Sequence, residues 1–216
     1  MSYTYIDPES CNANRRNICI GSQECPWYDL VITTSTMDMA HALVRNAYRP
    51  WTVITARHQT EGRGTHGRLW SSQTDKGLWL SLLLPPPENA DNLAGLSIMA
   101  AGALVKTLDV YADCMFLIKY PNDVVVNNHK IAGLMIESAT CDDAVRTVIL
   151  GMGVNFWQTR DDFVKDELHD ATSLYIETGY APDREQFIAT FLSYMKKWYK
   201  SGIPEPDYGK LPMNRY

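Results

Sequence analysis

The chain has 216 residues, of which 45% are hydrophobic, so it is long enough to bury one substantial core and we expect one domain. Its formal net charge of -5 and the lack of a Lys/Arg run argue against a nucleic-acid-binding surface as its main function. The five cysteines are odd in number and show neither Cys-x-x-Cys nor His-rich spacing, which argues against a zinc site and a disulfide framework.

The beginning of the chain carries no basic segment followed by an apolar run. The longest apolar stretch, residues 78–84, is too short to cross a bilayer. We therefore expect a cytoplasmic protein with free thiols and no membrane partner.

Residues 1–27 are polar, contain prolines and lack periodicity, so we expect an extended lead-in there. A β-type run at 28–34 comes next, and Ser35 with Asp38 three residues later has the form of a helix capping box. The hydroxyls of Ser35 and Thr36 could bind the polar head of a substrate or only cap the helix. The local sequence favours the cap.

The most informative stretch, from His58 to Trp70, follows an apolar run at residues 51–56. It interleaves glycines with arginines: Gly62, Arg63, Gly64, Gly67 and Arg68. Glycine lets backbone amides approach an anion closely, and arginine supplies a planar, permanently charged fork. The pattern indicates a strand that opens into a cationic loop capturing a multiply charged small molecule, although a surface turn of the same composition is equally compatible with it. The spacing is neither that of a Walker loop nor that of a dinucleotide fingerprint.

A buried strand is predicted at 78–84 and a core helix at 93–108. The next strand, at 115–118, leads into Lys119, which is followed by Tyr-Pro-Asn-Asp. A lysine at the end of an apolar strand would cost desolvation energy unless an anion were its partner.

Residues 124–126 and 130–137 predict a hairpin whose turn is Asn127-Asn128, since asparagine tolerates positive φ. The strand at 147–150 ends in Gly-Met-Gly-Val-Asn155. There, small residues would let a ligand lie against the backbone, or would form a glycine bulge. A last helix is predicted to begin near Asp183 and to have an apolar side formed by Phe187, Phe191, Met195 and Trp198. The tail from residue 201 is expected to be loose.

Four of these segments, in this order, resemble the catalytic domain of biotin protein ligases, within the biotin/lipoate ligase group. The matching stretches are Ser35-Thr36, residues 59–70, Lys119-Tyr-Pro-Asn-Asp123 with Lys130-Ile-Ala-Gly133, and residues 151–155 followed by Ala171-Thr-Ser-Leu174. The likeness covers residues 28–200.

This resemblance implies an α/β (α+β) fold of the class II aminoacyl-tRNA synthetase and biotin ligase type, with a mixed, largely antiparallel sheet and helices on one face. Residues 201–216 are expected to form a loose tail. Neither the small C-terminal β-barrel that members commonly have nor a DNA-binding domain is expected in this chain. The sequence leaves both a monomer and a homodimer open.

The resemblance further implies a two-step reaction. ATP and biotin give biotinyl-5'-AMP and pyrophosphate, and a lysine of a biotin carboxyl carrier domain of a biotin-dependent carboxylase then takes the biotin. Lys119 and Arg63 would be catalytic. Mg²⁺ is expected with ATP rather than at a side-chain cluster.

The site residues implied by the resemblance divide between the two substrates. Biotin would be bound by Ser35, Thr36, Met37, Gln59, Gly62, Arg63, Gly64, Thr65, Lys119 and Gly133. The nucleotide would be bound by Arg63, Gly67, Arg68, Trp70, Lys119, Asn122 and Asn155.

The chain departs from the family pattern at a few positions. Met37 stands where an asparagine or glutamine is usual, and Tyr120 replaces a tryptophan. Thr65 and His66 stand where many bacterial members have arginines, which lowers the charge of the loop and bears on how tightly the adenylate is retained.

Two alternatives remain. A lipoate or octanoate ligase would use a similar lysine, but the Arg-Arg-x-Ser-Gly-Gly-Gly loop of those enzymes is absent. A catalytically silent biotin-binding relative is suggested by Met37, Thr65 and the missing barrel.

Overall fold

The computed structural model describes residues 13–46, 49–72, 74–85, 93–141, 144–201 and 213–214. The backbone divides into two compact units. The first comprises Met1–Asp91 and Met135–Gly153, and the second comprises Asn92–Leu134 and Val154–Tyr216. The expectation of one domain stays a prediction. The strands β7 (His129–Cys141) and β8 (Ala144–Asn155) each contribute residues to both units.

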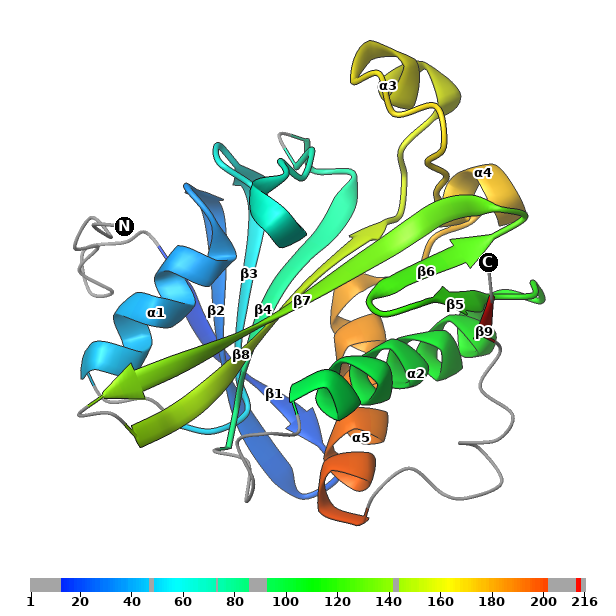
Figure 1. Ribbon diagram of the computed structural model, residues 1–216. Helices are drawn as coiled ribbons and strands as arrows, with labels where there is room; N and C mark the ends of the chain where they lie inside the picture. Colours follow the sequence, from blue (N-terminus) through cyan, green and yellow to red (C-terminus); the bar gives the residue numbers. More distant parts are fainter. Residues whose placement is uncertain are drawn as a thin grey trace. The chain divides into compact units, whose positions relative to one another are not determined.

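The sheet of the first unit begins with β1 (Asn14–Ile20), β2 (Gln23–Thr33), β3 (Thr52–Gln59) and β4 (Gly77–Leu84), and continues with β8 and β7. Strands β1 and β2 pair antiparallel, β2 and β3 parallel, and β3 and β4 antiparallel. The parallel pair needs a crossover, which is the helix α1 (Thr36–Asn46). This helix packs against β3 and β4 (Figure 1).

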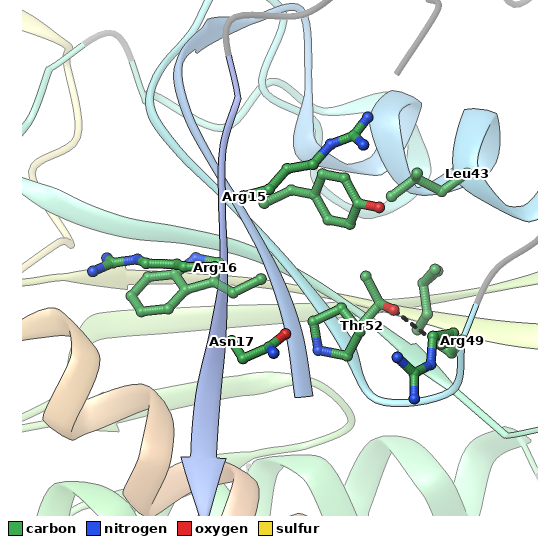
Figure 2. A pocket seen from close by; sticks show the side chains of 10 residues that line it. Arg15, Arg16, Asn17, Leu43, Arg49 and Thr52 are labelled. Atoms are coloured by element: carbon green, nitrogen blue, oxygen red, sulfur yellow. Dashed lines mark hydrogen bonds between the residues drawn. The ribbon is translucent and has the colours of Figure 1, made fainter. Parts of the chain in front are cut away.

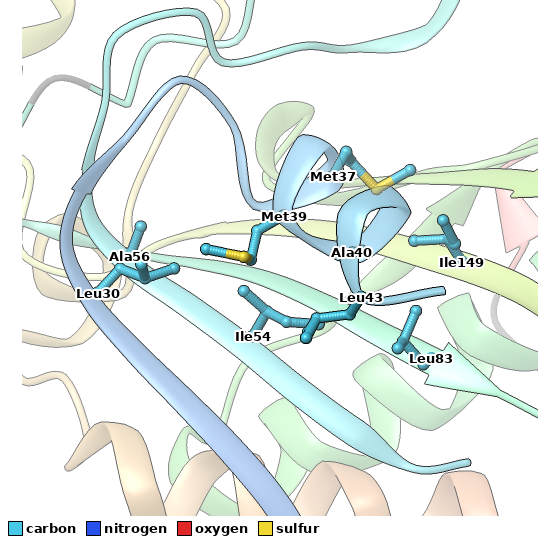
Figure 3. Packing of buried hydrophobic residues seen from close by; sticks show 9 residues of the cluster. All are labelled: Leu30, Met37, Met39, Ala40, Leu43, Ile54, Ala56, Leu83 and Ile149. Carbon is cyan, nitrogen blue, oxygen red and sulfur yellow. The ribbon is translucent and has the colours of Figure 1, made fainter. Parts of the chain in front are cut away.

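The core of this unit lies between α1 and the sheet (Figure 3). Helix α1 contributes side chains three and four residues apart, as an amphipathic helix does. The cluster consists of Leu30, Met37, Met39, Ala40, Leu43, Ile54, Ala56, Leu83 and Ile149. Burial of each of its large side chains contributes about 1.5–3 kcal/mol, so this cluster fixes the start of α1 on the sheet.

In the second unit the residues of β7 lie beside β6 (Asp123–Val126), then β5 (Leu117–Lys119) and β9 (Met213–Asn214). The β5–β6 and β6–β7 pairs are antiparallel, and β5 pairs parallel with β9. Asn127 and Asn128, which join β6 to β7, have φ values of 50° and 64°. The predicted asparagine turn is confirmed.

The described residues of the second unit form four helices: α2 (Leu93–Tyr111), α3 (Arg160–Lys165), α4 (Leu174–Thr178) and α5 (Arg184–Ser201). Helices α2 and α5 pack against each other. Phe187 of α5 meets Phe156 edge-on at 5.0 Å and stacks on Tyr111 at 5.6 Å between ring centroids. The predicted apolar side of the last helix is confirmed, because Phe187, Phe191, Met195 and Trp198 are all buried. The amide of Gln186 donates to Asp183 Oδ1 at 3.0 Å, which caps α5.

The mixed, largely antiparallel α+β arrangement is as predicted, but the structure differs from the expectation near both ends. Residues 14–27 are not a lead-in: they form β1 and the first part of β2, and Ile18, Cys25 and Trp27 are buried. Because Ile18 is the one buried residue of β1, the alternation that marks a strand is too weak to detect. The expected loose tail includes β9, while residues 1–12, 202–212 and 215–216 lie outside the described part.

Candidate functional site

The start of α1 is held by buried polar atoms. Ser35 and Thr36 are 1% and 3% exposed. The amide of Met37 donates to Ser35 Oγ at 3.2 Å, and the amide of Asp38 donates to the Ser35 carbonyl at 3.1 Å. Ser81 Oγ donates to Thr36 Oγ1 at 2.8 Å. Ser35 therefore caps the helix, as the local sequence favoured, while contact of these hydroxyls with a substrate stays a prediction.

Gln59, the last residue of β3, connects the start of α1 to the end of the glycine loop. Its Oε1 accepts a hydrogen bond from the Thr36 amide at 2.8 Å, and its Nε2 donates to Ser72 Oγ at 3.0 Å. Ser72 Oγ in turn donates to the Trp70 carbonyl at 3.1 Å. Gln59 is 6% exposed. Its amide thus sets the position of α1 relative to the loop, a role that the sequence did not indicate.

The glycines of the loop serve different purposes. A Cβ at Gly62 would lie 2.2 Å from Ser72 Oγ and 2.4 Å from the Trp70 carbonyl oxygen. Only glycine lets the loop close on itself there. Gly64 has room for a Cβ, whose nearest neighbour would be the Arg68 carbonyl oxygen at 3.6 Å, and Gly67 has φ +72° at the end of a short 3-10 turn, η1 (Thr65–Gly67).

Arg63 is held beside the first turn of α1. Its Nη2 lies 2.6 Å from Asp38 Oδ1, and Thr34 Oγ1 donates to Asp38 Oδ2 at 2.7 Å. The Nε atom of Arg63 is nevertheless buried and makes no hydrogen bond to a described residue, whereas Nη2 has Asp38 Oδ1 as its partner. A buried donor without an acceptor is costly. It suits a ligand that brings an anionic oxygen to the loop.

Trp70 closes the loop against β8. Its ring lies edge-on to Trp79 at 6.4 Å between centroids. A Cβ on Gly153 would approach the Trp70 ring to 2.5 Å. Residue 153 must therefore be glycine, because the Trp70 indole occupies the space that a Cβ would need. Strand β8 continues through this position.

Met37 is 3% exposed and packs in the hydrophobic cluster of α1. A Cβ on Gly151 would come within 2.9 Å of Met37 Sδ and of Met135 Cγ. The side chain that replaces the family's usual amide thus fills space between α1 and the sheet. Its assignment as a biotin contact stays a prediction.

Two further polar residues lie near Arg63 and were not identified from the sequence. His41 Nε2 is 2.6 Å from Glu137 Oε2. The hydrogen bond with His41 lowers the pKa of Glu137, burial opposes this shift, and the charges of His41 and Arg63 lower the pKa further. Glu137 lies 96 residues after His41, so no local pattern reveals the pair.

Lys119 belongs to the second unit. It is the last residue of β5, lies opposite Asp123 of β6 and is exposed, whereas Ile118 before it is buried. The expectation that Lys119 would cost desolvation energy is therefore wrong, because strand alternation places its side chain on the accessible side of β5. The peptide bond between Tyr120 and Pro121 is cis.

Asn122 and Asn155, predicted to lie near the nucleotide, make bonds that hold the second unit's backbone. Asn122 Nδ2 donates to the Leu134 carbonyl at 2.9 Å, and the Leu134 amide donates back to the Asn122 carbonyl at 2.8 Å. Asn155 Nδ2 donates to the Thr172 carbonyl at 2.9 Å, which fixes the 171–174 segment beside the end of β8. Gly133 pairs with Asp123 across β6 and β7.

The structure thus brings together Ser35, Thr36, Gln59, Gly62 and Trp70 through shared hydrogen bonds and close packing in the first unit. Arg63 joins them through Asp38. Lys119, Asn122, Gly133 and Asn155 lie in the second unit. Thr65 and Gly67 lie in the η1 turn, and Arg68 follows it.

The sequence matches a known protein family. The model of the biotin/lipoate A/B protein ligase family matches residues 28–155, more than half of the sequence. The chain belongs to this family. The matched range includes the glycine loop, Lys119 and Asn155.

Among similar sequences of the ligase family, the bifunctional ligase/repressor BirA of Bacillus spizizenii is 38% identical over 170 residues, covering 78% of this chain and 52% of that protein. The biotin–[acetyl-CoA-carboxylase] ligase of Paracoccus denitrificans is 34% identical over 148 residues, covering 67% of this chain and 61% of that protein. The chain thus spans about half the length of its BirA relative.

Among solved structures of the family, the biotin protein ligase from Aquifex aeolicus in complex with biotin and ATP superimposes with a TM-score of 0.70. It is 30% identical, and the match covers 81% of this chain and 70% of that one. This agreement confirms the predicted biotin ligase-like fold. No helix in the described ranges is both long and apolar enough to span a bilayer.

Proposed function

We propose that the chain is a biotin protein ligase, which activates biotin with ATP and transfers it to a carrier protein. The observation that carries this proposal is Arg63, whose buried donors lie in a glycine loop beside a helix start. The family membership supports it, as does the likeness to an Aquifex protein solved with biotin and ATP and to a Paracoccus protein named for ligation to acetyl-CoA carboxylase.

In the first step a carboxylate oxygen of biotin attacks the α-phosphorus of ATP, and the bond to the β-phosphate breaks to release pyrophosphate. Two anions must approach each other, so the main requirement is fixed positive charge and backbone donors. We assign Arg63 and the amides of residues 62–67 to the phosphate side. Lys119 would contact the carboxylate and the α-phosphate.

In the second step the amine of a carrier lysine attacks the carbonyl carbon of biotinyl-AMP. An amide bond forms, AMP leaves, and the amine loses a proton. The acceptor would be a biotin carboxyl carrier domain of a biotin-dependent carboxylase.

The remaining predicted site residues divide between biotin and the nucleotide. Ser35, Thr36, Gln59, Gly133 and the apolar side chain of Met37 would surround biotin, while Arg68, Trp70, Asn122 and Asn155 would surround the nucleotide. Mg²⁺ would be bound by the oxygens of the triphosphate, which are the ligands it prefers. A monomer and a homodimer both stay open, and sedimentation distinguishes them.

The test is transfer of biotin to a purified carrier domain with ATP and Mg²⁺, read as a mass increase on the carrier. We expect the increase with biotin and not with lipoate. Transfer of lipoate in its place would assign the chain to the lipoate-type ligases.

A further inference from the structure

Arg63, which we assign to the phosphate side of the first step, lies near two carboxylates to which the proposed reaction gives no role. They are Asp38, in the first turn of α1, and Glu137 of β7. All three residues belong to the first unit. The two carboxylates act on Arg63 in different ways.

Asp38 binds the guanidinium of Arg63 directly. Its Oδ1 lies 2.6 Å from Arg63 Nη2, and its Oδ2 accepts a hydrogen bond from Thr34 Oγ1 at 2.7 Å. Both oxygens therefore have a partner, and the carboxylate cannot rotate without losing one of them. The positive end of the α1 dipole also stabilises a carboxylate in the first turn.

This ion pair is better shielded from water than a surface pair of the same unit. The side chains of Arg63 and Asp38 are 31% and 15% exposed. Those of Arg57 and Asp75, which lie 3.8 Å apart, are 54% and 39% exposed. Exposed pairs contribute little, because water and salt screen them and the side chains lose entropy. The shorter and less exposed contact with Asp38 restricts Arg63 more strongly.

Thr34 connects this pair to the backbone of the glycine loop. Its hydroxyl donates to Asp38, while its carbonyl accepts a hydrogen bond from the Glu61 amide at 2.8 Å. The loop backbone before Arg63 and the carboxylate that binds Arg63 are thus held by the same residue.

The helix that carries Asp38 is anchored by packing. Met37 and Met39, on either side of it, are buried in the cluster of Figure 3. A cavity of about 370 Å³ near β1 and β2 reaches α1 at Leu43, more than one turn after Asp38 (Figure 2). This cavity therefore does not loosen the first turn of the helix.

Glu137 acts on Arg63 through its charge. Its Oε2 lies 2.6 Å from His41 Nε2. The hydrogen bond with His41 lowers the pKa of Glu137, burial opposes this shift, and the charges of His41 and Arg63 lower the pKa further. Glu137 thus adds negative charge near Arg63, while its own described hydrogen bond is to the histidine.

We propose that Asp38 is a positioning residue for the formation of the adenylate. It holds the Arg63 guanidinium in one orientation, so that the buried Nε, which has no hydrogen-bond partner among the described residues, remains available to a phosphate oxygen. Fixed donors stabilise a transition state better than mobile ones, because they need not reorganise as charge develops. This inference rests on the proposed ligase function, since it gives Asp38 a part in the same reaction.

The first test measures the mobility of Arg63 without any ligase activity. The Nε–H signal of Arg63, assigned by its loss in Arg63→Lys, should show the heteronuclear NOE of a rigid group in the wild-type chain. In Asp38→Ala the NOE should fall towards that of Arg68, an exposed arginine after the η1 turn. Asp38→Asn keeps an oxygen that can accept a hydrogen bond, so its NOE should lie in between. An NOE that is the same in all three chains would overturn the proposal.

The second test is the rate of biotin-dependent exchange of pyrophosphate into ATP. We expect kcat to fall about a hundredfold in Asp38→Ala and about tenfold in Asp38→Asn, because the donor is misplaced rather than removed. The KM for biotin should change little. Glu137→Gln is the matched control: it removes the neighbouring carboxylate, which bonds to His41, and should lower kcat much less.

A double-mutant cycle separates positioning of Arg63 from a general structural role. Because Asp38 acts through Arg63, Asp38→Ala should cost little further activity in a chain that already carries Arg63→Ala. Losses that multiply would contradict the proposal, as would a loss in Glu137→Gln as large as that in Asp38→Ala. Circular dichroism of each variant ensures that a lost rate does not reflect an unfolded chain.

Failure of the proposed function has a different outcome. Absence of biotin-dependent exchange in the wild-type chain would contradict the ligase assignment and, with it, the role of Asp38 in the reaction. The NOE of Arg63 would then still decide whether Asp38 fixes this arginine.

Discussion

At the scale of single residues, the proposed ligase activity depends most on Lys119. It is exposed at the end of β5, so removing its side chain should leave the fold intact. A lost contact to a charged transition state typically costs on the order of 3 kcal/mol, about a hundredfold in rate. We therefore expect Lys119→Ala to slow adenylate formation at least to that degree while weakening biotin binding only modestly.

The same position offers a second variant. Lys119→Arg keeps the charge but presents a planar fork at a different reach, so it should not restore the rate. Burst measurement of adenylate formation on folded protein checks both variants. Near-normal rates in Lys119→Ala would make the lysine a surface residue only.

Thr65 bears on retention of the adenylate. It begins the η1 turn and offers a hydroxyl at the position where the resemblance to bacterial biotin ligases implies an arginine. Thr65→Arg should slow release of biotinyl-AMP, because an added charge-assisted bond holds the phosphate. Stopped-flow displacement measures the release rate; an unchanged rate would show that position 65 does not affect retention.

Glu137 gives a prediction about pH. Its pKa is lowered from 4.5 by the hydrogen bond with His41. A carboxyl whose pKa is depressed in the folded state adds stability above its ordinary pKa and loses it as the pH falls through the folded value. The stability difference between the wild type and Glu137→Gln should therefore shrink below pH 4.5.

Urea unfolding across that pH range measures this difference, with Glu61→Gln as an exposed control. A difference between the wild type and Glu137→Gln that does not depend on pH would contradict the assigned pKa shift.

At the scale of elements, two glycines of the loop, Gly62 and Gly64, differ in the space available for a side chain. Gly62→Ala would drive a Cβ into the Trp70 carbonyl, whereas Gly64→Ala meets only ordinary contacts. Overpacking of this kind typically costs about 1–3 kcal/mol. We expect Gly62→Ala to lower the unfolding free energy by that amount and Gly64→Ala to change it little. Similar losses for both would mean that the loop does not close as described.

The elements that the sequence predicted are those with a strong local signal. The apolar run of β4, the asparagine turn and the apolar side of α5 all carry one. Strand β1 carries little signal, because a single residue, Ile18, is buried in it. Its place is set by pairing with β2, which local sequence does not reveal.

For the candidate site, too, the local sequence predicted only the parts with a strong local signal. The glycine loop and the end of β5 were found because their composition is unusual. The roles of Gln59, Asp38 and Glu137 were not found, since each depends on a partner from a different element. The prediction that Lys119 ends a strand is confirmed, but its exposure depends on strand alternation within a three-residue strand.

At the scale of the whole molecule, the central claim is that this chain activates biotin as an adenylate. The most direct measurement is exchange of labelled pyrophosphate into ATP by the folded wild-type chain with biotin, with lipoate and with neither. We expect exchange that requires biotin. Binding of biotin without any exchange would contradict it and favour a silent biotin-binding relative, and exchange that requires lipoate would contradict the assigned substrate.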